Sequence, residues 1–453
     1  MARIHAKPTE GMTYSPLDTH YFDPAMLKLE LDRVFDICAG CRMCFNLCPS
    51  FPALFKSADR YNNEVRELTA EETDRVVDTC YQCKICYVKC PYTPDDGHEF
   101  QLDFPRLMQR AKAVRVKRTG LAWRERLLGN PDLLGRLAAK VPWLVNLGNR
   151  LAINRRLMHA LLGVHRNKLL PNFHGVTFMR WFKRERSKLK LDGANGKVFY
   201  FPTCFVNYNA PEVGQAAVEV LTRNGVTLEC GYEQCCGMPA LDGGDVARAQ
   251  RLARANIAQL KPWVEHGYAV LVTNPTCSMM MRKEYVGLVG GEDAKALAEH
   301  VMDPNEYLNT LRRAGKLDLA FRSTPGRIAY HVPCHLRAQN IGYRSRDMMA
   351  AIGGSTEVEL VAECCGHDGT WAMKREYFMM SLEAGRKAFD GMKERAASGN
   401  GRTGIMTTDC PLAAIQFQQA TGVKPLHPLQ VLARAYRADG FATPVPPRPK
   451  SDG

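Results

Sequence analysis

The residues of this chain best suited to metal chemistry are its 17 cysteines. Eight of them form two runs, CAGCRMCFNLCP and CYQCKICYVKCP, and both runs follow the pattern C-x2-C-x2-C-x3-C-P. Three cysteines at this spacing can hold one face of a [4Fe–4S] cube, while the fourth reaches the neighbouring cube. We therefore predict two [4Fe–4S] clusters with crossed ligation, one held by Cys38, Cys41, Cys44 and Cys90, and one by Cys80, Cys83, Cys86 and Cys48.

Two other uses of these cysteines compete with clusters, a structural zinc site and a disulfide framework. Structural zinc sites typically use two separated pairs of ligands rather than a run of four. The N-terminus is polar and contains no apolar signal-peptide core, and no stretch is long and apolar enough to span a membrane. We therefore expect a cytoplasmic protein in a reducing environment, where metal ligation is more common than disulfide formation.

A second cysteine pattern fills the C-terminal half and occurs twice with nearly equal gaps. Each copy has a cysteine after a strand-like run, then a CCG tripeptide, then a cysteine after another strand-like run. The predicted metal ligands are Cys204, Cys235, Cys236 and Cys277 in the first copy, and Cys334, Cys364, Cys365 and Cys410 in the second. A repeat of this length indicates that one structural unit occurs twice.

Strands and helices alternate along both copies. β-branched or aromatic runs precede the cysteines at Lys197–Pro202, Ala269–Thr273, Arg327–Val332 and Gly404–Thr408. Helical patterns lie between them at Glu212–Arg223, Asp245–Glu265 and Trp371–Ala397. This alternation predicts a mainly parallel, doubly wound α/β sheet in each copy. Because loops at the carboxyl ends of parallel strands converge, we expect four thiolates from three loops to meet in each copy.

The net charge of +14 is concentrated between Arg110 and Lys190, where 20 Lys and Arg residues face three acidic ones. The same stretch contains Trp123, Trp143 and Trp181, and apolar residues recur in it at helical spacing, from Leu133 to Leu151. A basic amphipathic helix at an anionic membrane surface fits this composition. The alternative is a connector packed on its own domains. We expect no nucleic-acid binding, because no recognition motif accompanies the charge.

The twin C-x2-C-x2-C-x3-C-P run followed by two CCG repeats resembles the iron–sulfur subunits of flavin-linked dehydrogenases and heterodisulfide reductases. It resembles in particular the iron–sulfur subunits of anaerobic glycerol-3-phosphate dehydrogenase and of glycolate oxidase. The resemblance runs from about Phe35 to Tyr436 and includes the HPLQVLARAY segment near the end. It implies an α-helical ferredoxin domain around the first eight cysteines and metal-ligand roles for the cysteines of the CCG repeats.

The resemblance and the sequence patterns together predict a multidomain protein. We expect an α-helical two-cluster ferredoxin domain (1–109), a basic amphipathic connector (110–195), a first α/β CCG domain (196–300), a linker with a second α/β CCG domain (301–436), and a flexible tail (437–453). In one respect the chain departs from the heterodisulfide reductases, whose repeat ends in CxxC and supplies five cysteines. Here Asn274 and Ala413 stand where a further cysteine would be, so we expect one or two ordinary clusters in the CCG domains.

The predicted function is that of an iron–sulfur electron-transfer subunit. Such a subunit accepts electrons from a partner flavoprotein dehydrogenase and passes them toward quinone or another acceptor, with the protein at the inner face of the cytoplasmic membrane. No Gly-rich nucleotide fingerprint follows a strand, so we expect no FAD or NAD in this chain. The alternatives are a reductase of a disulfide, thiol or peroxide-linked partner at the CCG domains, and a non-redox scaffold that binds zinc.

Six further residues stand near the predicted ligands. His335, His367 and Asp409 are candidates for proton relay or for tuning a cluster by hydrogen bonding, although polar loop residues most often serve local turns. We expect Gly366 and its counterpart in the first repeat to let the backbone approach a cluster. Cys230 is left over, and a lone cysteine in a strand is most often a small buried apolar residue.

Overall fold

The computed structural model describes residues 5–9, 12–189, 193–397 and 404–444. Residues 445–453 of the predicted tail and residues 190–192 of the predicted connector lie outside this described part. The N-terminal part is helical, as the ferredoxin resemblance implied, and packs around Phe35, Phe51 and Phe104. Its helices are α1 (Pro24–Cys41), α2 (Ser50–Arg60), α3 (Ala70–Thr79), α4 (Ile85–Lys89) and α5 (Phe104–Thr119).

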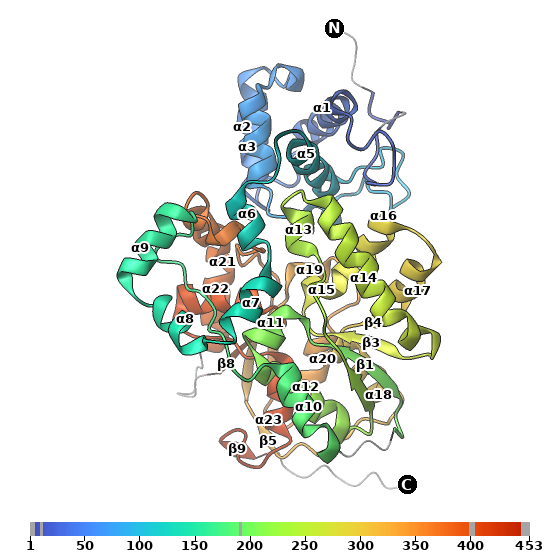
Figure 1. The fold of residues 1–453 in the computed structure, drawn as a ribbon, viewed down its shortest axis with the longest axis vertical. Coiled ribbons are helices and arrows are strands. Elements are labelled where there is room, and N and C mark those ends of the chain that lie inside the picture. Colours follow the sequence, from blue (N-terminus) through green and yellow to red (C-terminus); the bar gives the residue numbers. More distant parts are fainter. Residues whose placement is uncertain (1–4, 10–11, 190–192, 398–403, 445–453) are drawn as a thin grey trace.

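The basic stretch forms a series of short helices rather than one amphipathic helix. They are α6 (Trp123–Leu128), α7 (Pro131–Ala138), α8 (Pro142–Gly148), α9 (Ala152–Leu161) and α10 (Phe178–Glu185). Pro142 interrupts the apolar pattern because a proline can start a helix but cannot continue one. Helices α8 and α9 lie at the left edge of the molecule (Figure 1), and the His159 carbonyl of α9 accepts a hydrogen bond from Arg375, just before α21, at 3.5 Å. The segment after α9 joins the C-terminal half, since Arg375 N–H donates to the Gly163 carbonyl at 2.7 Å.

The C-terminal half contains two small parallel sheets with matching topology. The first has the order β2 (Thr227–Cys230), β1 (Lys197–Phe201), β3 (Ala269–Val272), β4 (Val301–Met302). The second has the order β7 (Glu357–Val361), β6 (Arg327–His331), β8 (Ile405–Thr408). All pairings within these two sheets are parallel. The predicted repeat and its parallel sheets are thus confirmed. A short antiparallel pair, β5 (Ser323–Thr324) and β9 (Thr443–Pro444), lies apart from them.

Helices cover the sheets and carry the cysteine loops. In the first repeat they are α11 (Thr203–Tyr208), α12 (Pro211–Arg223), α13 (Met238–Asp242), α14 (Val246–Glu265), α15 (Pro275–Met279), α16 (Tyr285–Val289), α17 (Glu292–His300) and α18 (Pro304–Arg313). In the second they are α19 (Cys334–Arg337), α20 (Arg344–Ala350), α21 (Phe378–Ala396), α22 (Pro411–Thr421) and α23 (Pro428–Ala435).

One hydrophobic core joins the two repeats. Alternate residues of β1 face opposite sides, so Tyr200 packs in this shared core while Phe199 and Phe201 pack against α14 and its neighbours. Tyr330 of β6 enters the shared core from the second sheet. Because strand side chains alternate between faces, each sheet can be covered on both sides, which is the doubly wound arrangement.

The predicted helix Trp371–Ala397 begins later than expected. The structure has a 3-10 turn at Trp371–Met373, and α21 begins only at Phe378. The indole of Trp371 donates from Nε1 to the carbonyl of Asp78 in the N-terminal part, at 2.9 Å. This contact with a distant part of the chain holds the segment away from the helical path that its local pattern favours.

Gly366 tests how tightly the second CCG loop packs. Its φ is +69°, and a Cβ there would lie 1.9 Å from the Ser381 carbonyl oxygen of α21. The backbone at Gly366 therefore approaches helix α21 closely. We predict that Gly366→Ala lowers the free energy of unfolding by about 2–5 kcal/mol, from backbone strain and overpacking together. Chemical denaturation followed by circular dichroism measures this change.

Gly422→Ala is the matched control, because its φ is +78° and nothing lies within 4 Å of the added Cβ. Gly422→Ala should lower the free energy of unfolding by about 1–2 kcal/mol, from backbone strain alone. Equal losses for both variants would show that the packing against α21 is not tight.

Candidate iron–sulfur sites

Four of the predicted ligands form a group near the surface of the N-terminal part, which we call the exposed ferredoxin group. They are Cys38, Cys41, Cys44 and Cys90. Cys38 and Cys41 lie in the last turn of α1, and Cys90 follows α4. Burial raises the pKa of the Cys38 thiol, and the charges of the three other cysteines raise it further. The side chain of Cys41 is exposed to solvent.

The next four predicted ligands form the buried ferredoxin group, namely Cys48, Cys80, Cys83 and Cys86. Burial raises the pKa of the Cys86 thiol, and the charges of Cys83, Cys48 and Cys80 add to this rise. Cys48 therefore lies among the cysteines of the second run, although it belongs to the first. The charge of Cys44 also reaches Cys86, so the two ferredoxin groups are neighbours.

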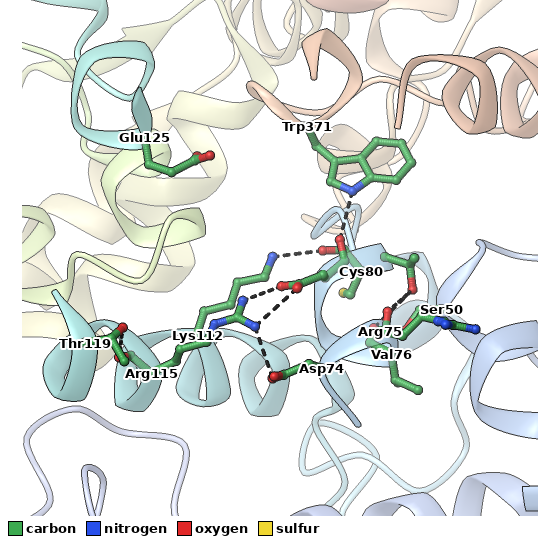
Figure 2. A network of polar contacts seen from close by, with 12 residues as sticks. Ser50, Asp74, Arg75, Val76, Cys80, Lys112, Arg115, Thr119, Glu125 and Trp371 are labelled. Carbon is green, nitrogen blue, oxygen red and sulfur yellow. Dashed lines mark hydrogen bonds and ion pairs between the residues drawn. The ribbon is translucent and has the colours of Figure 1, made fainter. Parts of the chain in front are cut away.

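Helix α5 supports the loop that begins at Cys80 (Figure 2). Lys112 Nζ donates to the Cys80 carbonyl at 3.0 Å, and Arg115 pairs with Asp74 and Asp78 at the end of α3. Burial raises the pKa of the Cys80 thiol, and the charge of Lys112 opposes that rise. A cation at this position stabilises the thiolate that metal binding requires.

The first CCG group consists of Cys204, Cys235, Cys236 and Cys277, which come from α11, the loop before α13, and α15. A hydrogen bond to Cys235 and burial raise the pKa of Cys204, and the pKa of the Cys235 thiol is correspondingly held well below its usual value. Cys236 interacts with both Cys235 and Cys277. The four thiols therefore meet, as the parallel-sheet argument requires.

Asp132 of α7 holds the loop of the first CCG group from the connector side. Its carboxylate accepts hydrogen bonds from the Cys235 backbone N–H at 2.5 Å and from the Tyr232 hydroxyl. Burial, followed by the charge of Cys235, raises the pKa of Asp132 to about 6. The sequence patterns did not single out this residue. The available signal was that Asp132 is one of only three acidic residues in the strongly basic stretch.

The second CCG group consists of Cys334, Cys364, Cys365 and Cys410. Burial raises the pKa of the Cys365 thiol well above its usual value, and Cys364 and Cys410 raise it further. Burial likewise raises the pKa of Cys334, with further contributions from Asp368 and Cys83. Cys334, His335 and Asp368 place their potential ligand atoms within 4.8 Å of one another. Asp368, from the CCGHDG segment, is a second residue that the sequence patterns did not single out.

The buried ferredoxin group and the second CCG group adjoin each other. The Tyr81 hydroxyl lies 3.0 Å from the sulfur of Cys364. Tyr81 also packs against Trp371, with their ring centroids 4.8 Å apart. The charge of Cys364 raises the pKa of Cys83, after burial. The two groups therefore lie on either side of one small apolar cluster.

His335 and Asp409, predicted as candidates for proton relay or cluster tuning, have different surroundings. His335 Nε2 lies 2.9 Å from the Gln82 carbonyl, and Nδ1 lies 2.9 Å from the Thr276 hydroxyl, so this histidine joins three parts of the chain. Asp409 accepts from Tyr330 at 2.6 Å and from Ser345 at 2.5 Å, which gives it a structural network of its own.

His367 and Cys230 complete the set. His367 is 5% exposed, and no described residue partners its Nδ1. The thiol of Cys230 contacts the Met179 sulfur at 3.6 Å and packs at the edge of the shared core. This is the position expected of a small apolar residue.

The donor sets fit iron–sulfur clusters. Each group supplies four cysteine thiols, and burial raises the pKa values of most of them, so thiolates held together here need a nearby positive charge. A metal centre supplies that charge, and soft sulfur ligands select iron–sulfur clusters or zinc over hard cations. Cysteine runs of the observed spacing favour the cluster.

Comparison with known protein families favours iron–sulfur clusters over zinc. The cysteine-rich (CCG) domain family matches residues 198–282 and 328–411, and the citrate utilization protein B Fer4-like domain family matches residues 31–118. The chain therefore contains a Fer4-like domain and two cysteine-rich CCG domains, and its role is that of an iron–sulfur electron-transfer subunit.

The chain is similar to proteins of several kinds. The chain is 28% identical to a subunit of the anaerobic glycerol-3-phosphate dehydrogenase of Escherichia coli K12 over 331 residues, which cover 73% of this chain and 81% of the relative. It is 25% identical to a subunit of the fumarate reductase (CoM/CoB) of Methanothermobacter marburgensis over 54% of this chain and 47% of that protein. It is 28% identical to lactate utilization protein A of Geobacillus sp. WCH70 over 39% of this chain and 75% of that protein.

Crossed ligation can be tested with a pair of serine variants. We predict that Cys48→Ser damages the cluster of the buried ferredoxin group, because Cys48 lies beside Cys83 and Cys86. Cys90→Ser, the matched variant in the other run, should damage the exposed group instead. Electron paramagnetic resonance of the reduced protein, with iron and labile-sulfide analysis, measures which cluster is affected. Loss of the exposed group's signal in Cys48→Ser would contradict crossed ligation.

Proposed function

We propose that this chain carries electrons from a flavoprotein dehydrogenase, of the kind that oxidises glycerol 3-phosphate, to a membrane quinone. The observation that carries the proposal is the continuous series of cysteine groups. Neighbouring groups are linked through Cys44 and Cys86, then through Tyr81 and Cys364. His335 and Thr276 connect the second CCG group to the first. Each link is short compared with the size of the molecule, which suits stepwise electron transfer.

The proposed cofactors are two [4Fe–4S] clusters in the ferredoxin groups and one cluster in each CCG group. Four thiols in each group match the needs of an ordinary cluster, and the absence of a fifth nearby cysteine from the sequence motif argues against a disulfide-cleaving centre. When bound, such clusters exchange single electrons. The residues of this chain set where the clusters lie and how polar their surroundings are.

Electrons enter, on this proposal, at the exposed ferredoxin group. Cys41 is exposed, and the neighbouring Met43 and Phe45 are also exposed although both are large and apolar. Exposed apolar residues next to a redox centre suit a docking surface for a partner protein. The three other groups are more enclosed, so the partner reaches the series at this end.

A variant that interrupts the series tests the route. We predict that Cys364→Ser leaves reduction of the ferredoxin clusters by the co-purified flavoprotein intact but slows quinone reduction by at least about 10–100-fold, the loss that follows when even an outer-shell partner of a metal site is removed. Stopped-flow absorbance under anaerobic conditions follows both steps. Cys230→Ser is the matched control, because this thiol lies outside the four groups and should change neither rate. Normal quinone reduction by Cys364→Ser would place electron exit in the ferredoxin groups.

We further propose that α7, α8 and α9 bring the protein to an anionic membrane surface. No helix among the described residues is long and apolar enough to cross a membrane. Instead, these helices expose large apolar side chains, with Trp143 and Ile153 each 68% exposed. Exposed basic side chains, including Arg136, Lys140 and Arg156, lie among them. The apolar face that could have packed internally is therefore at the surface here, which favours attachment in the membrane plane.

Binding to anionic liposomes tests this attachment. We predict that glutamate substitutions at Arg136, Lys140, Arg150 and Arg156 weaken binding by at least about 100-fold at low salt and reduce its dependence on salt, since each basic residue contributes about 1 kcal/mol near such a surface and every 1.4 kcal/mol is tenfold. The matched control reverses the exposed Arg251, Arg254, Lys261 and Lys295 of α14 and α17 and should have little effect. Sedimentation across a salt series measures both. Equal binding by the two variants would contradict the assignment.

A further inference from the structure

A cavity of about 500 Å³ lies between the connector and the first CCG group. We propose that this cavity binds the ring of a lipophilic quinone, which enters from the membrane and is reduced at the first CCG group. The inference rests on the proposed function and adds to it the place where the acceptor binds.

The walls of the cavity are mostly apolar, although Lys168, Asp242 and Asp368 also line it. Leu127, Leu134, Val145, Leu162 and Ile415 are among the residues that line it. Its volume is within the range of ligand cavities in proteins, and an aliphatic wall suits a substituted ring with an isoprenoid tail.

The floor of the cavity is the redox site. Cys204, Cys235, Cys236 and Cys277 all line the cavity, so a bound ring would lie against the first CCG group. Electron transfer to a bound molecule needs this proximity. The cavity is therefore the natural exit of the series of cysteine groups.

His367 supplies a polar contact at the floor. It lines the cavity, is 5% exposed, and has an Nδ1 atom that no described residue partners. A buried polar atom without a partner is costly, so such an atom in a cavity indicates a ligand or water that completes its hydrogen bonding. The carbonyl oxygen of a quinone is one such acceptor for an imidazole N–H.

The mouth of the cavity coincides with the exposed apolar surface. Leu137 and Val141 both line the cavity and are exposed, and the neighbouring Leu144, Leu147 and Leu157 are exposed as well. Large exposed apolar patches mark protein or membrane contacts. Because the basic residues of α7–α9 favour an anionic bilayer, we commit to a membrane quinone as the occupant rather than to a protein segment.

The chemistry balances with two electrons and two protons. A bound quinone would accept two electrons, one at a time, from a cluster held by the first CCG group, and with two protons its two carbonyl groups would become the two hydroxyl groups of a quinol. The electrons come from the flavoprotein through the preceding cysteine groups. The protons come from water by way of an adjoining pocket, whose lining includes Lys112, Glu125 and Asp242. Asp242 lines both the pocket and the cavity.

Filling the cavity tests the proposal. We predict that Leu134→Trp raises the Kd for decylubiquinone by about tenfold or more, because an added indole would overpack the site. The measurement is equilibrium binding to the full-length protein in detergent, with the quinone-induced change in the spectrum of the CCG cluster as a second readout. Leu162→Trp on another part of the wall is the second variant. Iron content confirms that each variant has folded.

Met379→Trp is the matched control, because Met379 is 68% exposed on α21 and does not line the cavity. It should leave both binding and cluster spectra unchanged. Unchanged quinone affinity in folded Leu134→Trp and Leu162→Trp would overturn the proposal, as would occupation of the cavity by phospholipid that decylubiquinone fails to displace.

The failure of this inference is distinguishable from the failure of the proposed function. If the flavoprotein reduces the clusters and a water-soluble dye accepts the electrons while quinone does not bind, the cavity assignment is wrong and electron transfer stands. If quinone binds in the cavity but no flavoprotein reduces the clusters, the donor in the proposed function is wrong.

Discussion

The arrangement of the sites depends on the contacts that the loop between Cys80 and Cys86 makes. Tyr81 reaches Cys364, the carbonyl of Gln82 reaches His335, and Lys84 forms a buried ion pair with Glu284 at 3.0 Å. Burial alone would raise the pKa of Glu284, but Lys84 and Arg106 hold it at about 2. A buried pair gains little net stability, since desolvation opposes attraction, but loss of either partner leaves a charge unpaired. This loop therefore keeps one position between both CCG domains.

That fixed position converts separate metal sites into a series. Two residues of the loop, Gln82 and Lys84, have positive φ values of 61° and 63°, and such backbone persists only where surrounding contacts hold it. The contacts are those that place the buried ferredoxin group beside the second CCG group. The same contacts therefore hold the strained backbone of the loop and fix the order of the cysteine groups.

The connector has two faces with different consequences. Through Asp132 it supports the Cys235 loop, and through Leu134 and its neighbours it roofs the cavity above the first CCG group. Its outer face leaves Trp143 and Ile153 in solvent. A protein that remained in water throughout its work would gain by burying such residues, because each exposed apolar side chain forgoes a burial energy of about 1.5–3 kcal/mol. The surface is explained if it meets a membrane.

The sequence by itself determined the chemistry and the local structure. The spacing within CAGCRMCFNLCP and CYQCKICYVKCP, and the strands before Cys204 and Cys334, depend on residues close together in the chain, and periodicity reports such short-range geometry well. Only the tertiary structure decided the late start of α21, the support of Cys235 by Asp132, and the cavity at the first CCG group. These depend on contacts between distant segments, such as Trp371 with Asp78, whose partners no local pattern specifies because packing of whole elements brings them together.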